Sequence, residues 1–252
     1  MSDDISEVLA DWPHDGDSGL QVRRILGDDH RPKLQVRLDL GLLQMETTGR
    51  PDGKRPAGHP SLLQYYQHAA EEYRRQHAWY EGFELDAGEC AQLRTEALHY
   101  YHRRMAFMAL GEYGSAIADA EHNLLILDLV RAFAREPDDR VALERFRPFI
   151  TSHKVRCEVL QHLQNEDVQA ALLELERGME DLRELFQEQD RLGEFPFSQE
   201  KTLLDELRQK LDLHHQVSHR QNLQMRLDEA LRREDPDVAA ELRAQLREME
   251  RE

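Results

Sequence analysis

Two pairs of acidic and histidine side chains have the spacing of metal ligands on helices. Glu96 and His99 are three residues apart, and so are Asp119 and His122. An acid-x-x-His pair on each of two helices is half of a di-iron carboxylate site, because residues at i and i+3 share a helix face. Nothing in the sequence selects the two further carboxylates that such a site needs. We therefore assign no metal ligand and keep a metal-dependent helical-bundle enzyme as a lesser alternative.

Other residues that could do chemistry lack a complete pattern. His215 and His219 lie one helical turn apart, but no third metal ligand is near them in the sequence. The loop GRPDGKRP has neither the glycine spacing nor the Ser or Thr after its lysine that a phosphate loop requires. Cys157 lies among apolar residues of an expected helix, which predicts a buried, unreactive thiol. The sequence therefore predicts no catalytic residue, no cofactor and no enzymatic activity.

The composition limits the partners that the chain can bind. Its 252 residues carry a formal net charge of −17, and the pI is about 5.2. This acidic excess argues against direct binding to nucleic acid, since contacts to phosphates need a basic surface. No apolar run is long enough for a membrane span, and Cys90 and Cys157 form no CxxC pair. We expect a cytoplasmic protein whose partners are proteins, with no direct nucleic-acid or membrane contact.

The segment KLQVRLDL predicts a β-strand within an N-terminal region at residues 1–58. Leu34, Val36, Leu38 and Leu40 alternate with polar residues, and a period of two predicts one buried strand face. With GDDHRP as a turn and VRRIL before it, the segment forms a β-hairpin. Because an isolated hairpin is marginally stable, we expect it to pack on helices.

A mainly α-helical body is expected at residues 59–195, where the apolar period becomes helical. Asp86 followed by Glu89 is a capping pair that opens a helix reaching Leu110. Short turns join this helix to its successors, which predicts antiparallel neighbours.

The turn after Leu110 resembles the tight turn of a tetratricopeptide repeat. Leu110-Gly111-Glu112-Tyr113 and Ala116 carry the resemblance: Gly111 allows the turn, Tyr113 fills the gap between helices, and Ala116 lets the backbones approach. Arg104 and Asn123 depart from the pattern, since small residues are usual there. The resemblance implies a helical hairpin array, and the alternative is two ordinary helical hairpins.

Residues 196–252 are expected to form a long helix, capped by Ser198, and then a C-terminal helical hairpin. Apolar residues follow one another with the spacing of a coiled-coil seam, which predicts two stripes that can face each other. The stripes consist of Leu223, Leu227 and Leu231, and of Ala239, Leu242, Leu246 and Met249. A hairpin of this size needs the rest of the chain, a second copy or a partner to be stable.

The same segment resembles a UVR motif, the helical hairpin shared by the excision-repair proteins UvrB and UvrC. The resemblance rests on Glu234-Asp235, on Ala239-Ala240-Glu241-Leu242-Arg243 and on Leu246, with Leu223 and Leu227 upstream. A strand region, a helical middle and a terminal UVR motif together are similar to bacterial proteins that carry this motif. The resemblance implies a protein–protein contact module. Its partner-binding residues would be Leu223, Leu227, Ala239, Leu242, Arg243, Leu246 and Met249.

These features favour a non-catalytic adaptor that binds proteins through the C-terminal hairpin and the helical body. Its partners would be UvrB/UvrC-type proteins or a second copy of the chain. The alternative is an accessory factor of nucleotide excision repair, which would contact repair proteins and not DNA.

Overall fold

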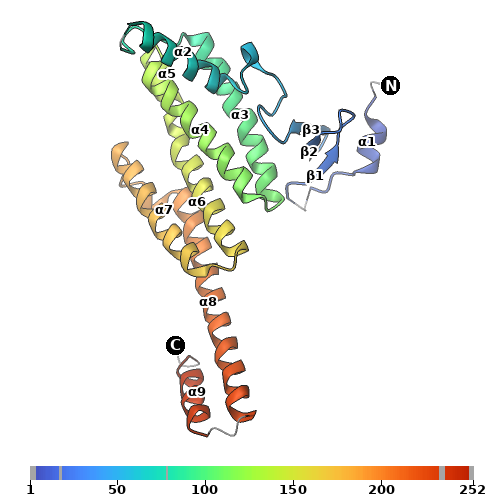
Figure 1. The fold of residues 1–252 in the computed structure, drawn as a ribbon, viewed down its shortest axis with the longest axis vertical. Helices are drawn as coiled ribbons and strands as arrows, with labels where there is room; N and C mark the ends of the chain where they lie inside the picture. The colour runs from blue at the N-terminus through green and yellow to red at the C-terminus, as the bar shows by residue number, and fades with distance from the viewer. Residues whose placement is uncertain (1–3, 17–18, 78, 233–235, 250–252) are drawn as a thin grey trace.

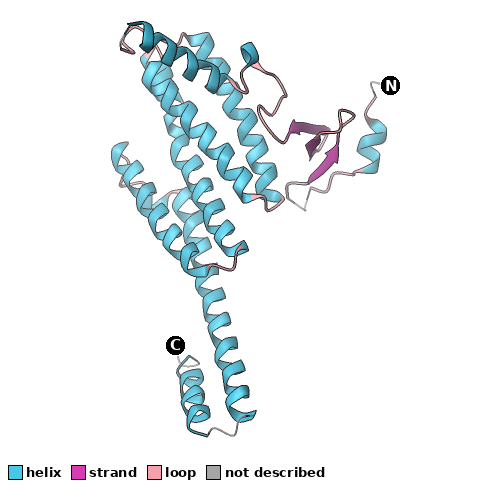
Figure 2. Ribbon diagram, viewed as in Figure 1, coloured by secondary structure: helices cyan, strands magenta, loops and turns pink. Residues whose placement is uncertain are grey.

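The protein is mainly α-helical, as the helical periodicity predicted. The computed structural model describes residues 4–16, 19–77, 79–232 and 236–249, and within these ranges it contains nine α-helices and one three-stranded sheet (Figures 1 and 2). The N-terminal sheet lies against one side of a helical body. The last two helices extend from the opposite end of that body (Figure 1).

The sheet is antiparallel and has the order β1-β2-β3, with β1 at Val22–Leu26, β2 at Pro32–Leu38 and β3 at Gly41–Glu46. The predicted hairpin is β1 and β2, and β3 adds a strand to it. Leu34, Val36 and Met45 of the sheet share a buried core with Phe107 and Cys157 of the helical body. The sheet is therefore stabilised by the helical body, as expected for so small a sheet.

The expectation of a single buried face on β2 is wrong in two respects. Leu38 and Leu40 are exposed, Leu40 by 90%, because β2 ends at Leu38 and the chain turns there into β3. Gln35 and Arg37, expected on the outer face, are buried. Arg37 Nε donates to the carbonyl of Trp12 at 2.6 Å, so the segment after α1 (Ser6–Asp11) contributes to covering this outer side.

The helical body consists of stacked antiparallel hairpins. Its helices are α2 (Leu62–His77), α3 (Ala87–Ala109), α4 (Tyr113–Phe133), the short α5 (Pro137–Ala142), α6 (Arg147–Gln164) and α7 (Val168–Glu188). Helix α3 packs along α4, α4 along α6, and α6 along α7 (Figure 1). The predicted capping box at the start of α3 is confirmed: Glu89 N donates to Asp86 Oδ1 and Asp86 N donates to Glu89 Oε2, both at 2.8 Å.

The turn between α3 and α4 is the one predicted from Gly111. This glycine has a φ of +71°, a left-handed conformation that glycine adopts without strain. The next residue, Glu112, donates its N–H back to Phe107 O at 2.9 Å and closes the end of α3. Gln164 at the end of α6 donates to Gly111 O at 2.8 Å, while Ala116 is fully buried. The two hairpins are thus joined at this end.

Helix α8 (Gln199–Arg232) is 34 residues long and belongs to two parts of the molecule. Ser198 Oγ accepts the N–H of Lys201 at 3.1 Å, which confirms the predicted cap. Leu204, Leu207 and Leu211 pack in the core of the body with residues of α6 and α7. Beyond them α8 continues away from the body and pairs with α9 (Pro236–Met249) (Figure 1).

Membrane-spanning helices are not found among the residues that the structure describes, since none is both long and apolar enough.

Candidate functional site

The C-terminal hairpin of α8 and α9 has a small core of its own. Leu223, Leu227 and Ala230 on α8 are buried against Leu242 on α9, and Leu246 packs beside them partly buried. The leucine stripes therefore meet each other, as their spacing indicated. Four predicted partner-binding residues are the leucines at 223, 227, 242 and 246, and they pack α8 against α9. They would support partner binding indirectly, by holding the two helices together.

The other predicted partner-binding residues divide into two cases. Arg243 is exposed on α9, so its charge is available at the hairpin surface. The side chains of Ala239 and Met249 lie outside the described residues.

The surface of the hairpin carries apolar side chains that the sequence analysis did not single out as contacts. Met225 is 63% exposed, and Val238 and Leu231 are also exposed. Met225 lies two residues after Leu223, a rotation of about 200° on a helix, which places it on the side of α8 away from α9. Leu231, expected in the stripe, is exposed at the end of α8, one turn beyond Leu227. Single exposed apolar residues are common on protein surfaces, so these three do not by themselves define a binding patch.

Helix α8 contributes to both the body core and the hairpin core. Among the α8 side chains that the structure describes, Leu211 is the last in the body core and Leu223 is the first in the hairpin core. These twelve residues correspond to roughly 18 Å along a helix. One continuous helix thus fixes the distance between the body and the hairpin.

The acids and histidines of the two sequence pairs do not contact each other as paired in the sequence, because α3 and α4 bring different partners together. His122 Nε2 lies 3.0 Å from Glu96 Oε1, so the partners come from different pairs. Glu96 also accepts the backbone N–H groups of Leu62 at 2.7 Å and Leu63 at 3.1 Å. It therefore acts as a distant cap for the first turn of α2, where N–H groups have no partner inside the helix.

Asp119 is also fully engaged, with Arg103 as its partner. Arg103 donates from Nη2 to Oδ1 at 2.6 Å and from Nε to Oδ2 at 2.9 Å, a bidentate buried ion pair. The remaining histidine, His99, is 3.9 Å from Asp52 on the GRPDGKRP loop. Arg50 of this loop pairs with Asp52 at 3.0 Å and with Glu96 at 3.5 Å, which ties the loop to α3.

The pKa values of the two carboxylates follow from these contacts. Burial acts to raise the pKa of Glu96, but hydrogen bonds from His122 and from the N–H groups of Leu62 and Leu63 together lower it below its usual value. For Asp119, burial outweighs the hydrogen bonds from Arg103 and raises the pKa. Both side chains use their oxygen atoms within the protein, which is the behaviour of structural carboxylates.

The described part of the chain contains no metal-binding cluster and no reactive thiol. No group of three His, Cys, Asp or Glu side chains there could hold a metal ion, and the side chains of His215 and His219 lie outside it. Cys90 and Cys157 are buried free thiols, and burial raises the pKa of each to about 11. Both are therefore thiols and not thiolates near neutral pH.

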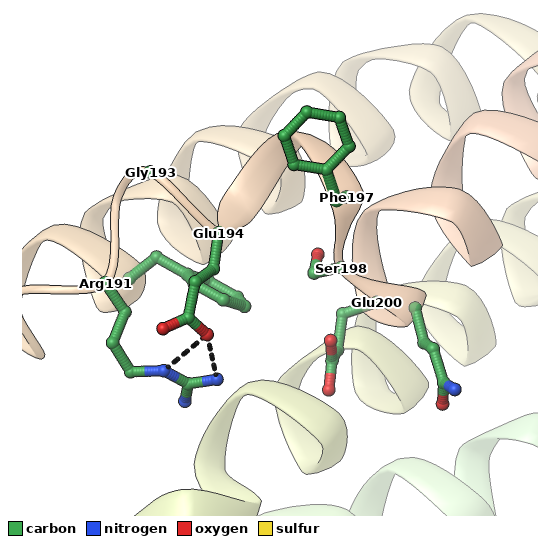
Figure 3. A pocket seen from close by; sticks show the side chains of 8 residues that line it. Arg191, Gly193, Glu194, Phe197, Ser198 and Glu200 are labelled. Atoms are coloured by element: carbon green, nitrogen blue, oxygen red, sulfur yellow. Dashed lines mark hydrogen bonds and ion pairs between the residues drawn. The ribbon is translucent and has the colours of Figure 1, made fainter.

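A surface hollow of about 450 Å³ lies at the turn between α7 and α8 (Figure 3). Its arginine, Arg191, is already paired with Glu194 Oε2 at 3.0 and 2.8 Å and stacks over the ring of Phe186. Phe197 points away from this pair and is 87% exposed (Figure 3). The hollow therefore offers an exposed aromatic contact, while its positive charge is already neutralised.

Comparison with protein families, with curated proteins and with solved structures finds no match for this chain.

Proposed function

We propose that the protein is a non-catalytic adaptor that presents its C-terminal hairpin to a partner protein. The observation that supports this most directly is that the hairpin has its own hydrophobic core. This core consists of Leu223, Leu227, Ala230, Leu242 and Leu246. This core keeps α8 and α9 together at a distance from the body, so the outer faces of both helices are available for contact. The engaged carboxylates of α3 and α4 favour this role over a metal-dependent enzyme.

The partner would dock on the outer surface of the hairpin, around Met225, on the side of α8 away from α9. Methionine adapts its shape to a binding surface, and apolar residues surrounded by charges are typical of protein contacts. Arg243 adds an exposed cation on α9. The leucines of the hairpin core contribute indirectly, because without them the two helices would not hold this surface in shape.

The decisive experiment is affinity capture from a host lysate followed by mass spectrometry. The full chain is compared with a truncation ending at Arg220 and with Met225→Asp, which charges the surface and leaves the hairpin core intact. The matched control is Leu173→Asp on α7, because Leu173 is 66% exposed, much like Met225. A protein captured by the full chain and by the control, and lost with the truncation and with Met225→Asp, supports the proposal.

Identical captured proteins from all four chains would show that the hairpin does not bind a partner. Light scattering on the purified full chain and the truncation separates self-association from capture of another protein. A second copy as partner predicts a dimer that Met225→Asp reduces to a monomer.

A role in nucleotide excision repair is a narrower proposal that rests on the UVR-like residues at 234–246. It predicts that purified UvrB/UvrC-type proteins bind the full chain and release it when Met225 is charged. If the captured partner belongs to another process, the adaptor role stands and the repair role is withdrawn.

A further inference from the structure

A cavity of about 480 Å³ lies between α3, α4 and the start of α6. Its lining is largely apolar and aromatic, with Leu98, Tyr101, Leu127, Phe146 and Phe149 among its residues. Cavities of a few hundred Å³ with apolar walls and a few polar groups are typical of small-molecule sites. The polar groups of this cavity therefore decide which molecule it would accept.

Arg104 lines this cavity with a guanidinium that has no hydrogen-bond partner. Its side chain is 0% exposed, and Nε, Nη1 and Nη2 are all unpaired among the described residues. The ring centroids of Tyr101 and Phe149 lie 5.5 and 5.8 Å from its Cζ. Cation–π contacts with these rings therefore stabilise the charge of Arg104 in part. An arginine in such surroundings lacks the acceptors that a buried charge normally has.

Among the described residues, the acidic groups that act on Arg104 do not neutralise it. Asp119 is held by Arg103 in the bidentate pair, and Cys157 stays protonated because burial raises its pKa to about 11. Burial also lowers the pKa of Arg104 to about 10, which still leaves the guanidinium charged near neutral pH. The cavity thus holds one buried positive charge that its own residues do not balance.

Asn123 is the second polar residue in the lining that lacks a partner. Its Oδ1 is buried without a hydrogen-bond donor among the described residues. Arg104 and Asn123 are also the two positions that depart from the small residues of the tetratricopeptide pattern. Arg104 offers unpaired donors and Asn123 Oδ1 is an unpaired acceptor, so only the Arg104 guanidinium calls for an anionic ligand in this cavity.

We propose that this cavity binds a small organic monocarboxylate with an apolar body. The Arg104 guanidinium has no surface open to the cavity in this structure, so it would turn toward the carboxylate on binding and donate two parallel hydrogen bonds to it. The apolar body would occupy the space between the aromatic and leucine side chains. A single negative charge fits better than a phosphate, because the only other arginine in the lining, Arg94, is at the rim and pairs with Asp139 at 3.0 Å. This inference is independent of the adaptor role.

The test uses octanoate and octan-1-ol as probes, titrated into the full chain by calorimetry. The two probes share their apolar chain and differ in charge, so we expect octanoate to bind at least ten-fold more tightly than the alcohol. Arg104→Met keeps the length of the side chain without its charge and should reduce octanoate binding to the level of octanol. Equal binding of both probes, no binding of octanoate, or undiminished octanoate binding by Arg104→Met would overturn the proposal.

A second variant keeps the test valid if Arg104→Met does not fold. Leu98 lines the cavity and is about half exposed, so Leu98→Glu places a carboxylate beside the cavity with little effect on the core. Leu125→Glu is the matched control, since Leu125 is exposed to a similar extent and does not line the cavity. We expect Leu98→Glu to weaken octanoate at least ten-fold and the control to bind as the unmodified chain does. Equal affinities of the two variants would contradict the proposal.

Discussion

At the scale of single residues, Glu96 stabilises a helix that begins more than thirty residues before it. Its two oxygens accept the N–H groups of Leu62 and Leu63 and contact His122. Helix α2 also has a local cap, since Ser61 Oγ accepts the N–H of Gln64. Glu96 therefore connects the start of α2 to both α3 and α4, and its loss should affect more than one helix end.

We predict that Glu96→Ala lowers the free energy of unfolding by about 3 kcal/mol or more, because it leaves buried donors without an acceptor. Urea unfolding followed by circular dichroism measures this loss. The control is Glu121→Ala, because Glu121 is largely exposed and pairs only loosely with Lys154 at 3.7 Å. Similar losses in the two variants would mean that Glu96 contributes no more than a surface carboxylate.

His153 gives the fold a dependence on pH. It is buried beside the ring of Phe149, and burial together with the charges of Arg104 and Arg156 lowers its pKa to about 4. The unfolded chain binds a proton at the usual pKa of about 6.5, while the folded chain does not until about pH 4. The stability contributed by neutral His153 is therefore full above pH 6.5 and is lost as the pH falls from there to about 4.

We predict that the unmodified chain loses about 2 kcal/mol more stability than His153→Gln between pH 7 and pH 5, since each pKa unit corresponds to about 1.4 kcal/mol. Unfolding in urea at several pH values measures both curves. Parallel curves over this range would show that His153 takes up its proton in the folded state as readily as in the unfolded state.

At the scale of elements, the contact between α6 and α7 depends on one glycine. A Cβ at Gly178 would overlap with both methyl carbons of Val155. Valine has little freedom to move aside, because its χ1 is restricted in a helix. The close approach of these helices in the second hairpin therefore requires the absence of a side chain at 178.

We predict that Gly178→Ala destabilises the protein by about 1–3 kcal/mol through overpacking, although alanine is the better helix former by about 1 kcal/mol. Adding Val155→Ala should restore part of the loss, because it opens the space that the new methyl group needs. Thermal unfolding of the two single variants and the double variant measures this coupling. Purely additive effects would show that the two side chains do not meet.

Local patterns were enough to predict both ends of α3 and the start of α8. The capping box at Asp86 and the turn at Gly111 depend on residues close in sequence, and both are confirmed. Strand β3 was not predicted as a separate strand, because Leu42 and Leu43 are consecutive apolar residues and break the period of two. The burial of Gln35 and Arg37 was not predicted either, because it depends on contacts across the fold: Gln35 bonds with Arg23 and Gln44 of the neighbouring strands, and Arg37 donates to the carbonyl of Trp12.

The candidate sites were predictable to different degrees. The leucine stripes of the hairpin meet because their spacing along two adjacent helices already sets the pairing. The contact of Glu96 with His122 was not predicted, because it depends on how α3 and α4 are rotated against each other. The cavity lined by Arg104 and Asn123 was not predicted, because an empty volume follows from the packing of many side chains at once.

At the scale of the whole molecule, α8 is one continuous helix that runs from the body core to the hairpin core. Its length therefore sets both the distance of the hairpin from the body and its direction around the helix axis. Each residue inserted between Leu211 and Leu223 would rotate the hairpin by about 100° around the axis of α8 and move it by about 1.5 Å. A seven-residue insertion returns the hairpin to within about 20° of its first direction and moves it by about 10 Å. A two-residue insertion turns it toward the opposite side and moves it by only about 3 Å.

This periodicity separates two ways in which the molecule could use the hairpin. If a partner contacts the hairpin and the body together, we expect a two-residue insertion of alanine to abolish capture and a seven-residue insertion to weaken it less. If the partner contacts the hairpin alone, capture should be the same at every insertion length. The direction in which the hairpin points around the axis of α8 would then not matter for binding. The long helix would serve only to hold the hairpin at a distance from the body.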